Sequence, residues 1–340
     1  SNQVSLTMVI TAFAIVYVIW GSTYLGIRYA VESIPPFLMA GSRHLVAGML
    51  LFTFAMMRSA TLPTRAQWRD ATIAGILMLV IGNGGVSWAE QLIPSGIAAL
   101  LVALTPAWMV LIDWARPGGK RPRALVGLGL LIGLTGVVVL ARKQMSGTSS
   151  AYGWGVAAVL TASICWAFGS VFNRTARKPK SAFLGVSMQM ITGGLVLLGL
   201  AVLQGEAKRF SFAQVTAVSF WAWLYLTIAG SLVAYTAYVW LLHASTPARV
   251  ATYAYVNPLI AVILGCTIGR EVFAPDMYLA GGLIIAAVIL VLRGGATPAS
   301  TSQNPSNESI ATAQPTTISN PLLNVAPPIV ADKPGADGKP

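Results

Sequence analysis

The sequence predicts an all-α integral membrane protein with ten transmembrane helices, arranged as two inverted five-helix repeats with both termini in the cytoplasm. Three observations lead to this fold class. Hydrophobic residues make up 56% of the 340-residue chain and charged residues only 9%, whereas soluble domains carry about 25% charged residues. Apolar runs long enough to cross a hydrocarbon core of about 30 Å recur along the chain. Motifs in the first half return in the second half at a nearly constant spacing.

The apolar runs are the predicted helices, and each has roughly the 17–25 residues that a membrane span needs. In chain order they are 6–28, 37–57, 71–90, 94–115, 123–141, 152–172, 182–203, 219–242, 247–268 and 277–293. Continuous apolar runs indicate helices, because strands of a membrane barrel show short alternating segments instead. The first run lacks the basic start and small-residue cleavage site of a signal peptide, so we expect it to be retained. Cys165 and Cys266 lie within runs and predict small core residues rather than a disulfide or metal site.

The basic residues predict the orientation in the membrane. If the N-terminus is cytoplasmic, thirteen Lys and Arg residues fall on the cytoplasmic side and six on the outer side, which is the positive-inside bias. The net charge of +12 therefore indicates topology, and we expect no nucleic-acid partner. Residues 294–340 are rich in Pro, Ser, Thr, Ala and Asn, and predict a disordered cytoplasmic tail.

An internal repeat links the two halves of the chain. The stretches "IWGSTYLGIR" (19–28) and "CWAFGSVFNR" (165–174) place Trp20 and Trp166, and likewise Arg28 and Arg174, 146 residues apart. Later in each half, a Trp precedes a Pro by eighteen residues, as Trp88–Pro106 and Trp240–Pro258. We therefore predict a first repeat over 6–142 and a second over 152–293. Because five is an odd number of spans, the second copy crosses the membrane in the opposite sense, an architecture typical of secondary transporters with a site between the halves.

Aromatic and uncharged polar side chains within the runs are candidates for a cavity. Trp20 and Tyr24 share one face of the first helix with Phe13 and Tyr17. Trp usually lies at the membrane interface, so a mid-membrane Trp20 indicates either a cavity wall or helix–helix packing. The candidate substrate-binding residues are Trp20, Tyr24, Asn83, Trp88, Trp108, Trp166, Gln189, Tyr235, Tyr253, Tyr255 and Asn257.

Ionisable residues and prolines in the spans are candidates for gating or coupling. A charge in mid-span costs about 3 kcal/mol or more, so Arg43 and Glu90 predict either an ion-pair gate or a structural pair. Glu90 and His44 are the candidate proton carriers. Proline removes a backbone hydrogen bond and kinks a helix, either as a hinge or as a static bend. The set is Arg28, Arg43, His44, Glu90, Pro106, Arg174 and Pro258.

Several motifs are absent. There is no phosphate-binding loop, no H-E-x-x-H, no G-x-S-x-G and no cluster of Cys and His. We therefore expect no enzyme, no catalytic residue, no metal and no cofactor. Gly129 and Gly133 form a G-x-x-x-G in the fifth run, which predicts close packing either on a neighbouring helix or on a second protomer. A homodimer would use this fifth helix or the Gly-containing tenth.

The order and spacing of these motifs resemble the EamA family of the drug/metabolite transporter superfamily over about residues 6–293. The resemblance is carried by "IWGSTYLGIR", by "GSRHLVAGMLL" with Arg43, and by "PSGIAALLVALTPAW" with its partner "TPARVATYAYVNPLIAVILG". The last stretch continues into "GREVF", whose Glu271 matches the family's glutamate after the ninth helix. The first half departs from the family, since Gly119 stands where its glutamate would be.

The resemblance implies a bacterial inner-membrane exporter with a substrate cavity between its halves and alternating access. The family includes aromatic amino-acid exporters of the YddG type, so we expect a small amphiphilic metabolite, such as an aromatic or neutral amino acid, as substrate. A multidrug, sugar or other metabolite exporter on the same fold remains an alternative. A lipid-linked flippase or a membrane scaffold is the alternative of another class.

Overall fold

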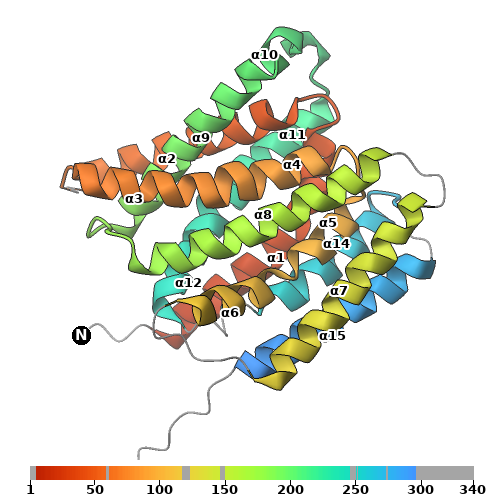
Figure 1. The fold of residues 1–340 in the computed structure, drawn as a ribbon. Coiled ribbons are helices and arrows are strands. Elements are labelled where there is room, and N and C mark those ends of the chain that lie inside the picture. The colour runs from red at the N-terminus through yellow and green to blue at the C-terminus, as the bar shows by residue number, and fades with distance from the viewer. Residues whose placement is uncertain are drawn as a thin grey trace, which may run out of the picture. The chain divides into compact units, whose positions relative to one another are not determined.

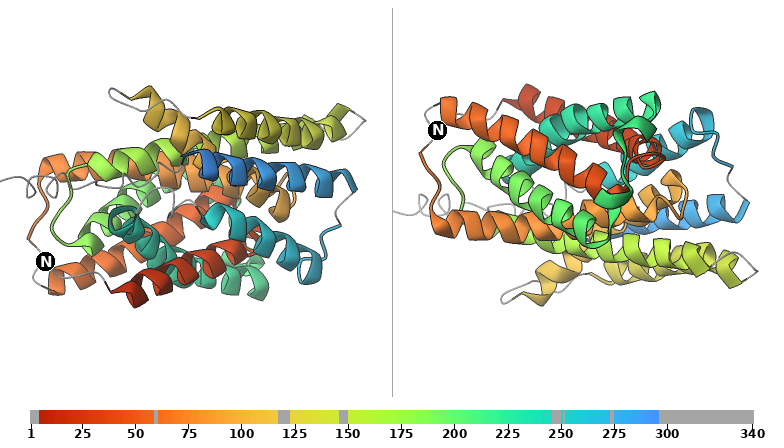
Figure 2. Two further views of the ribbon diagram at one scale, coloured as in Figure 1. Left: turned by 90° about the horizontal axis from the view of Figure 1, so that it is seen from below. Right: turned by 90° about the horizontal axis from the view of Figure 1, so that it is seen from above.

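The computed structural model describes residues 5–58, 61–116, 123–145, 150–245, 250, 252–272 and 275–295, and every regular element in these ranges is helical. The all-α class predicted from the apolar runs is confirmed for this part of the chain. The predicted tail lies outside the described residues beyond Gly295. Figure 2 shows that most of the long helices run along roughly one direction and lie side by side.

The helices of the first half overlap the predicted runs, and Figure 1 shows how they are arranged. They are α1 (Leu6–Ala30), α2 (Pro36–Met57), α3 (Arg65–Gly75), the π-helix η1 (Ile76–Gly84), α4 (Gly85–Ala89), α5 (Ser95–Val102), α6 (Thr105–Ala115) and α7 (Ala124–Met145). The helices α3, η1 and α4 follow one another without a break.

The second half is also helical throughout its described residues. Its elements are α8 (Ser150–Thr175), α9 (Ala182–Leu203), the short α10 (Glu206–Arg209) and 3₁₀-helix η2 (Phe212–Gln214), α11 (Ala217–Tyr225), the π-helix η3 (Leu226–Tyr235), α12 (Thr236–Ala244), α14 (Tyr253–Thr267) and α15 (Pro275–Gly295). The predicted start of the ninth run at 247 lies outside the described residues.

Seven helical segments are long and apolar enough to cross a membrane. They are Leu6–Ala30, Pro36–Met57, Arg65–Ala89, Ser95–Ala115, Ser150–Thr175, Ala182–Leu203 and Ala217–Ala244. Three shorter apolar helices, Ala124–Val139, Val256–Thr267 and Met277–Val291, accompany them. A multi-pass membrane protein is therefore confirmed, while the number of spans and the side of each terminus stay predictions.

The third segment begins at Arg65, six residues before the predicted start. The reason is a capping box. The Thr64 side chain accepts a hydrogen bond from the Gln67 backbone N–H at 3.3 Å, and the Gln67 side chain accepts one from the Thr64 N–H at 2.8 Å. These bonds satisfy N–H groups that a helix start leaves unpaired, so the helix extends through polar residues that hydropathy alone excludes.

The fourth predicted run, 94–115, is interrupted at its middle by a turn at Ala103 and Leu104, between α5 and α6. Pro106 is the cause, because it has no N–H to donate to the carbonyl oxygen of Val102 four residues earlier. The Thr105 hydroxyl donates to that oxygen instead, at 2.6 Å. In the second half, Pro258 lies inside the continuous helix α14. Pro106 therefore accompanies a break in its helical segment, whereas Pro258 does not.

Close helix pairs position these elements. The helix α2 packs along α9, and α7 packs along α15 (Figure 1). A Cβ on Gly129 would lie 2.8 Å from the carbonyl oxygen of Ala287 in α15, and one on Gly133 would lie 3.1 Å from the Ala287 Cβ. The glycine face predicted in the fifth run thus contacts a neighbouring helix of the same chain. A homodimer through other faces of α7 or α15 stays a prediction.

Two carboxylates cap helices that are distant in sequence. Glu271, after α14, accepts hydrogen bonds from the Ser95 N–H at 3.0 Å and the Ser95 hydroxyl at 2.7 Å, at the start of α5. Glu206 in α10 accepts a bond from the Leu38 N–H at 2.8 Å, in the first turn of α2. A negative charge at a helix N-terminus is favourable because the unpaired N–H groups point toward it. Each cap joins the two halves of the chain.

A central cavity lined by aromatic side chains

The two Trp residues that head the repeated stretches meet at the centre of the bundle. Trp20 on α1 and Trp166 on α8 lie edge to face, with ring centroids 5.5 Å apart. Tyr238 lies 4.7 Å from Trp20 and 5.7 Å from Trp166, and Tyr253 lies 5.7 Å from Trp20. Tilted and edge-to-face contacts at these distances are the favoured aromatic geometries. The rings of this cluster therefore come from both halves of the chain.

A cavity with about 540 Å³ of empty space adjoins this cluster. Five predicted substrate-binding residues line it: Trp20, Tyr24, Asn83, Trp166 and Tyr253. The rest of its wall is small or apolar, with Thr23, Ile27, Gly82, Val86, Val102, Ala162 and Ser163. Small-molecule sites have the same character, because they are mainly apolar with a few placed polar groups.

A second, more polar cavity of about 300 Å³ shares Trp20, Thr23, Asn83 and Trp166 with the first. Its other lining residues are Arg43, His44, Leu79, Gly230, Ser231 and Tyr235. We call the first the aromatic compartment and the second the polar compartment. The four shared residues, which include both Trp20 and Trp166, make them two parts of one site.

Buried polar groups line the polar compartment. The Arg43 guanidinium donates to the Asn83 side-chain oxygen, and the His44 Nε2 lies 3.4 Å from the same oxygen. The His44 Nδ1 lies 3.4 Å from the Ser231 hydroxyl. The Arg43 Nε has no hydrogen-bond partner. Arg43, His44 and Ser231 are at most 3% exposed, so this network is shielded from water.

Both π-helices contribute to the compartments. Gly82 and Asn83 come from η1, and Gly230, Ser231 and Tyr235 come from η3. A π-helical turn holds an extra residue and is often found at functional sites. The break between α5 and α6 serves the same site, because Val102 at that break lines the aromatic compartment.

Several predicted substrate-binding residues lie outside the lining. Trp108 donates to the Ser163 hydroxyl at 3.1 Å, and Gln189 accepts a bond from the Tyr235 hydroxyl at 2.7 Å, so each holds a lining residue. Asn257 is buried, with its amide nitrogen oriented to donate to the carbonyl oxygens of Tyr17 at 3.1 Å and Tyr253 at 3.3 Å. Trp88 packs against the hydrophobic core. The side chain of Tyr255 lies outside the described residues.

The candidate gating residues do not form the expected ion pair. No Arg43–Glu90 contact within 4 Å occurs among the described ion pairs, because Arg43 bonds to Asn83 instead. Arg28 donates to the backbone oxygen of Glu90 at 2.9 Å. The Glu90 carboxylate is fully buried and has no hydrogen-bond partner. The side chain of Arg174 is exposed at the end of α8.

Sequence reasoning missed some lining and contact residues. The ring of Tyr238 contacts both tryptophans. Its hydroxyl accepts a hydrogen bond from the Trp166 Nε1 at 3.2 Å and forms a second hydrogen bond with the Ser170 hydroxyl at 2.9 Å. It lies three residues after Tyr235, on the same helix face, and that spacing could have indicated it. Thr23 and Ser231 carry no comparable pattern.

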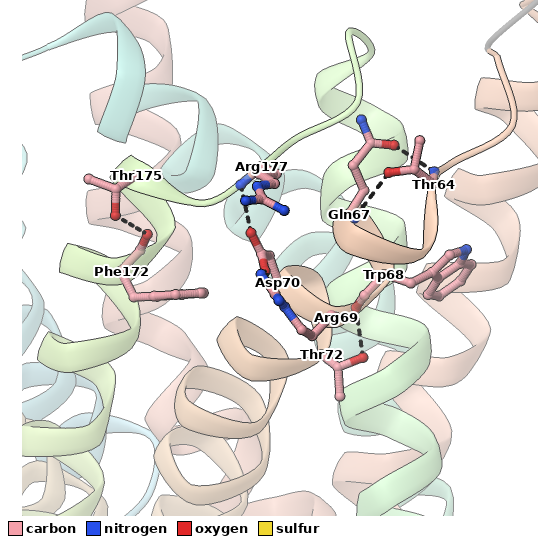
Figure 3. Close-up of polar contacts among 9 residues, drawn as sticks. All are labelled: Thr64, Gln67, Trp68, Arg69, Asp70, Thr72, Phe172, Thr175 and Arg177. Carbon is pink, nitrogen blue, oxygen red and sulfur yellow. Dashed lines mark hydrogen bonds and ion pairs between the residues drawn. The ribbon is translucent and has the colours of Figure 1, made fainter.

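A polar connection joins the start of α3 to the linker between α8 and α9. Asp70 points toward this linker (Figure 3) and accepts a bond from the Arg177 backbone N–H at 2.9 Å. The Gln67 side chain donates to the Lys178 carbonyl oxygen at 3.0 Å. Asp70 also pairs with Arg69 at 2.7 Å. This connection links the two halves of the chain at one end of the bundle, on the side predicted to be cytoplasmic.

Comparison with known proteins identifies the family. The EamA-like transporter family matches residues 7–142 and 153–293. The chain is 40% identical over 279 residues to the inner membrane transporter YedA of Escherichia coli strain K12, which covers 82% of this chain and 88% of the relative. It is 23% identical over 290 residues to the transporter YvbV of Bacillus subtilis strain 168, which covers 85% of this chain and 93% of that relative.

A crystal structure with 20% sequence identity shares the fold, with a TM-score of 0.61 over 87% of this chain and 100% of the other. The expected location in the bacterial inner membrane agrees with the name of YedA and is confirmed, as is the expectation of a transporter rather than an enzyme. The chain belongs to the EamA-like transporter family, within the drug/metabolite transporter superfamily that its motifs resemble.

Proposed function

We propose that this chain exports small amphiphilic metabolites, in particular aromatic or neutral amino acids, by alternating access. The observation that carries the proposal is the pair of adjoining compartments that share Trp20 and Trp166 in their walls. One compartment offers rings and apolar walls, and the other offers a buried basic and amide group. A substrate with an apolar body and a polar head matches both in one orientation.

The proposal includes ten spans in two inverted five-helix repeats, with both termini cytoplasmic. Helix packing supports this symmetry. The helix α1 packs against η3 and α14, while its counterpart α8 packs against η1 and α6. The helices α2 and α9 pack on each other, as do α7 and α15. Each π-helix also lies shortly before the matching Trp, Trp88 or Trp240.

Alternating access would use the asymmetry between the halves. The broken helix at Pro106 and the continuous α14 with Pro258 border the site from opposite repeats. We expect rocking of one repeat against the other to open the cavity to each side in turn. The Asp70–Arg177 connection would close the cytoplasmic side, and Glu90 and His44 are the residues that would carry a coupling proton.

The test is transport by purified protein in liposomes. Liposomes loaded with unlabelled phenylalanine, leucine or tryptophan are diluted into the labelled compound, and exchange is followed with and without a pH gradient. We expect exchange of aromatic or other neutral amino acids. A dependence on the pH gradient would show coupling to protons, and its absence would indicate facilitated transport.

The matched control is Trp154→Ala, since Trp154 is 67% exposed on α8, the helix that also carries Trp166. Trp20→Ala should abolish exchange and Trp154→Ala should not. If wild-type protein exchanges no amino acid, the proposed substrate is wrong. Scrambling of labelled lipid under the same conditions would then support a flippase.

A further inference from the structure

We infer that the polar compartment binds a carboxylate group of the cargo through Arg43, so that the site selects apolar or aromatic carboxylates over amines and neutral analogues. This inference rests on the proposed function and names the chemical group that the transporter recognises. It follows from the charge inside the two compartments and from the hydrogen-bond donors left free there.

The charge balance of the lining favours an anion. Among the described residues that line either compartment, Arg43 carries the only permanent charge, and none is Asp or Glu. His44 is the other basic side chain. A buried cation without a neighbouring anion repels cationic ligands and attracts anionic ones. A carboxylate is the anionic group that an amphiphilic metabolite most simply supplies.

Arg43 itself lacks a charged partner. Its side chain is 2% exposed, it bonds the neutral Asn83 oxygen, and its Nε is left without any partner. A guanidinium has five N–H donors arranged in a fork that matches a carboxylate. A buried charge is costly unless an opposite charge is close. An anion bound in the compartment would therefore supply the opposite charge and the hydrogen-bond acceptor that Arg43 lacks.

The acidic residues near Arg43 do not satisfy it. Glu90 interacts with Arg43 and Arg28 electrostatically, but its carboxylate forms no hydrogen bond to either side chain. Glu271 is bound to Ser95 at the start of α5. Glu271 is therefore occupied by Ser95, and Glu90 is not in hydrogen-bond contact with Arg43. Neither carboxylate lines the polar compartment.

Neighbouring groups can contribute to binding. The contacts of His44 with Asn83 and with Ser231 are each 3.4 Å, at the long end of hydrogen-bond geometry. These weak contacts can be exchanged for shorter ones to a ligand. The aromatic compartment, which shares Trp20 and Trp166 with the polar one, offers apolar walls for the body of the ligand. The carboxylate and body would therefore bind in a fixed orientation.

The test measures binding in detergent, where no transport is needed. The ligands form matched pairs: phenylalanine with phenylalanine amide, and 3-phenylpropionate with 3-phenylpropionamide. Phenyl phosphate distinguishes a carboxylate from another anionic head. Affinity is read from quenching of tryptophan fluorescence and from the shift in unfolding temperature.

We expect wild-type protein to bind each acid at least about tenfold more tightly than its amide, as a charge-assisted hydrogen bond provides. Arg43→Gln should bring acid and amide to similar affinities. Arg43→Lys keeps the charge without the fork and should retain an intermediate preference. Arg58→Gln is the control and should keep the wild-type preference, because Arg58 is exposed at the end of α2, the helix that carries Arg43, and lines neither compartment.

Equal binding of acids and amides by wild-type protein would overturn the inference, as would an undiminished preference in Arg43→Gln. Failure to bind any of the acids, or tighter binding of phenyl phosphate than of 3-phenylpropionate, would also overturn it. If Arg43→Gln does not fold, the test rests on Arg43→Lys, and a preference of that variant for acid over amide as large as that of the wild type would overturn the inference. Absence of transport by a protein that binds acids in this way would contradict the proposed function alone.

Discussion

Trp20 and Trp166, which occupy the same position in two matching stretches 146 residues apart, touch each other at the centre of the bundle, with ring centroids 5.5 Å apart. The repeat thus brings its own equivalent residues into contact. If the halves form the proposed inverted repeat, such contact arises where α1 and α8 lie beside the axis that would relate them. Both rings line the aromatic compartment and the polar compartment.

Removing either ring should impair transport and also lower stability. Trp20 contacts three other rings, Trp166, Tyr238 and Tyr253, and each such contact contributes about 0.5–1.5 kcal/mol beyond burial. We expect Trp20→Ala and Trp166→Ala to lower the initial rate of phenylalanine exchange at least about tenfold, and Trp20→Phe to retain part of it. Wild-type rates in both Ala variants, at equal amounts of protein, would contradict the cavity assignment.

The contact between α2 and α9 should tolerate no added methyl group at Gly194. A Cβ there would lie 2.7 Å from the Leu45 backbone nitrogen and 3.0 Å from the Gly41 carbonyl oxygen, and backbone atoms cannot rotate away. Gly194→Ala should therefore destabilise the protein by about 1–3 kcal/mol, measured as a lower unfolding temperature in detergent.

Gly199 lies five residues later on the same helix and is the matched control. Nothing lies within 4 Å of a Cβ added there. Gly199→Ala should leave stability unchanged or raise it by up to about 1 kcal/mol, because Ala favours helix more than Gly does. Equal effects of the two variants would mean that α2 and α9 are not as closely packed as described.

Glu271 should stabilise the start of α5. Its carboxylate accepts bonds from both the N–H and the hydroxyl of Ser95. We expect Glu271→Ala to cost about 1–2 kcal/mol, read from thermal unfolding in detergent. Glu32→Ala is the control, since Glu32 is exposed, and it should change the unfolding temperature little. A result in which Glu32→Ala matches Glu271→Ala would argue against the cap.

Glu206 should make stability depend on pH in the acidic range. Burial raises the pKa of its carboxyl above the ordinary value of 4.5, although bonds from the Leu38 and Phe37 N–H groups and the charge of Arg209 act in the opposite direction. The folded state then binds the proton more tightly than the unfolded chain does. This contribution to stability is complete below pH 4.5 and is lost as pH rises through the raised pKa.

The measurement is the unfolding temperature of wild-type protein and Glu206→Gln across this range. The Gln side chain can still accept the Leu38 bond but does not titrate. We expect the wild-type curve to decline relative to the Gln curve as pH rises above 4.5. Parallel curves would show that Glu206 does not titrate differently in the folded state.

Asp70 should protect the linker between α8 and α9. Asp70→Ala leaves the Arg177 N–H without its acceptor, which at about 1–2 kcal/mol corresponds to roughly tenfold more frequent local opening. We expect faster cleavage by trypsin after Arg177, in everted vesicles if this side is cytoplasmic. Asp113→Ala is the control, because the Asp113–Arg116 pair is exposed. Cleavage at the wild-type rate would contradict the role of Asp70.

The sequence predicted the helices and several lining residues because both depend on local composition. A continuous apolar run must be helical in a bilayer, and Trp20, Asn83 and Trp166 were conspicuous as large or polar groups within such runs. The ends of helices were predicted less well. The capping box at Thr64 extended one helix through a polar stretch, and Pro106 divided another.

The partners of the charged groups could not be predicted. Arg43 bonds Asn83 rather than Glu90, and Glu271 caps a helix that lies 176 residues away. Such choices depend on distances of a few tenths of an ångström between elements that are far apart in sequence. Tyr238 was missed for a related reason, since its ring faces the two tryptophans only through the packing of the η3–α12 segment against α1 and α8.

The sequence by itself thus determined the membrane class, the helices and the repeated positions, because hydropathy and internal spacing are properties of the chain alone. Only the tertiary structure decided that the repeated tryptophans meet, that the cavity has an aromatic and a polar part, and that Arg43 is left with a free donor in the latter. These features arise from packing between distant helices, where a buried group is satisfied only by what happens to lie beside it.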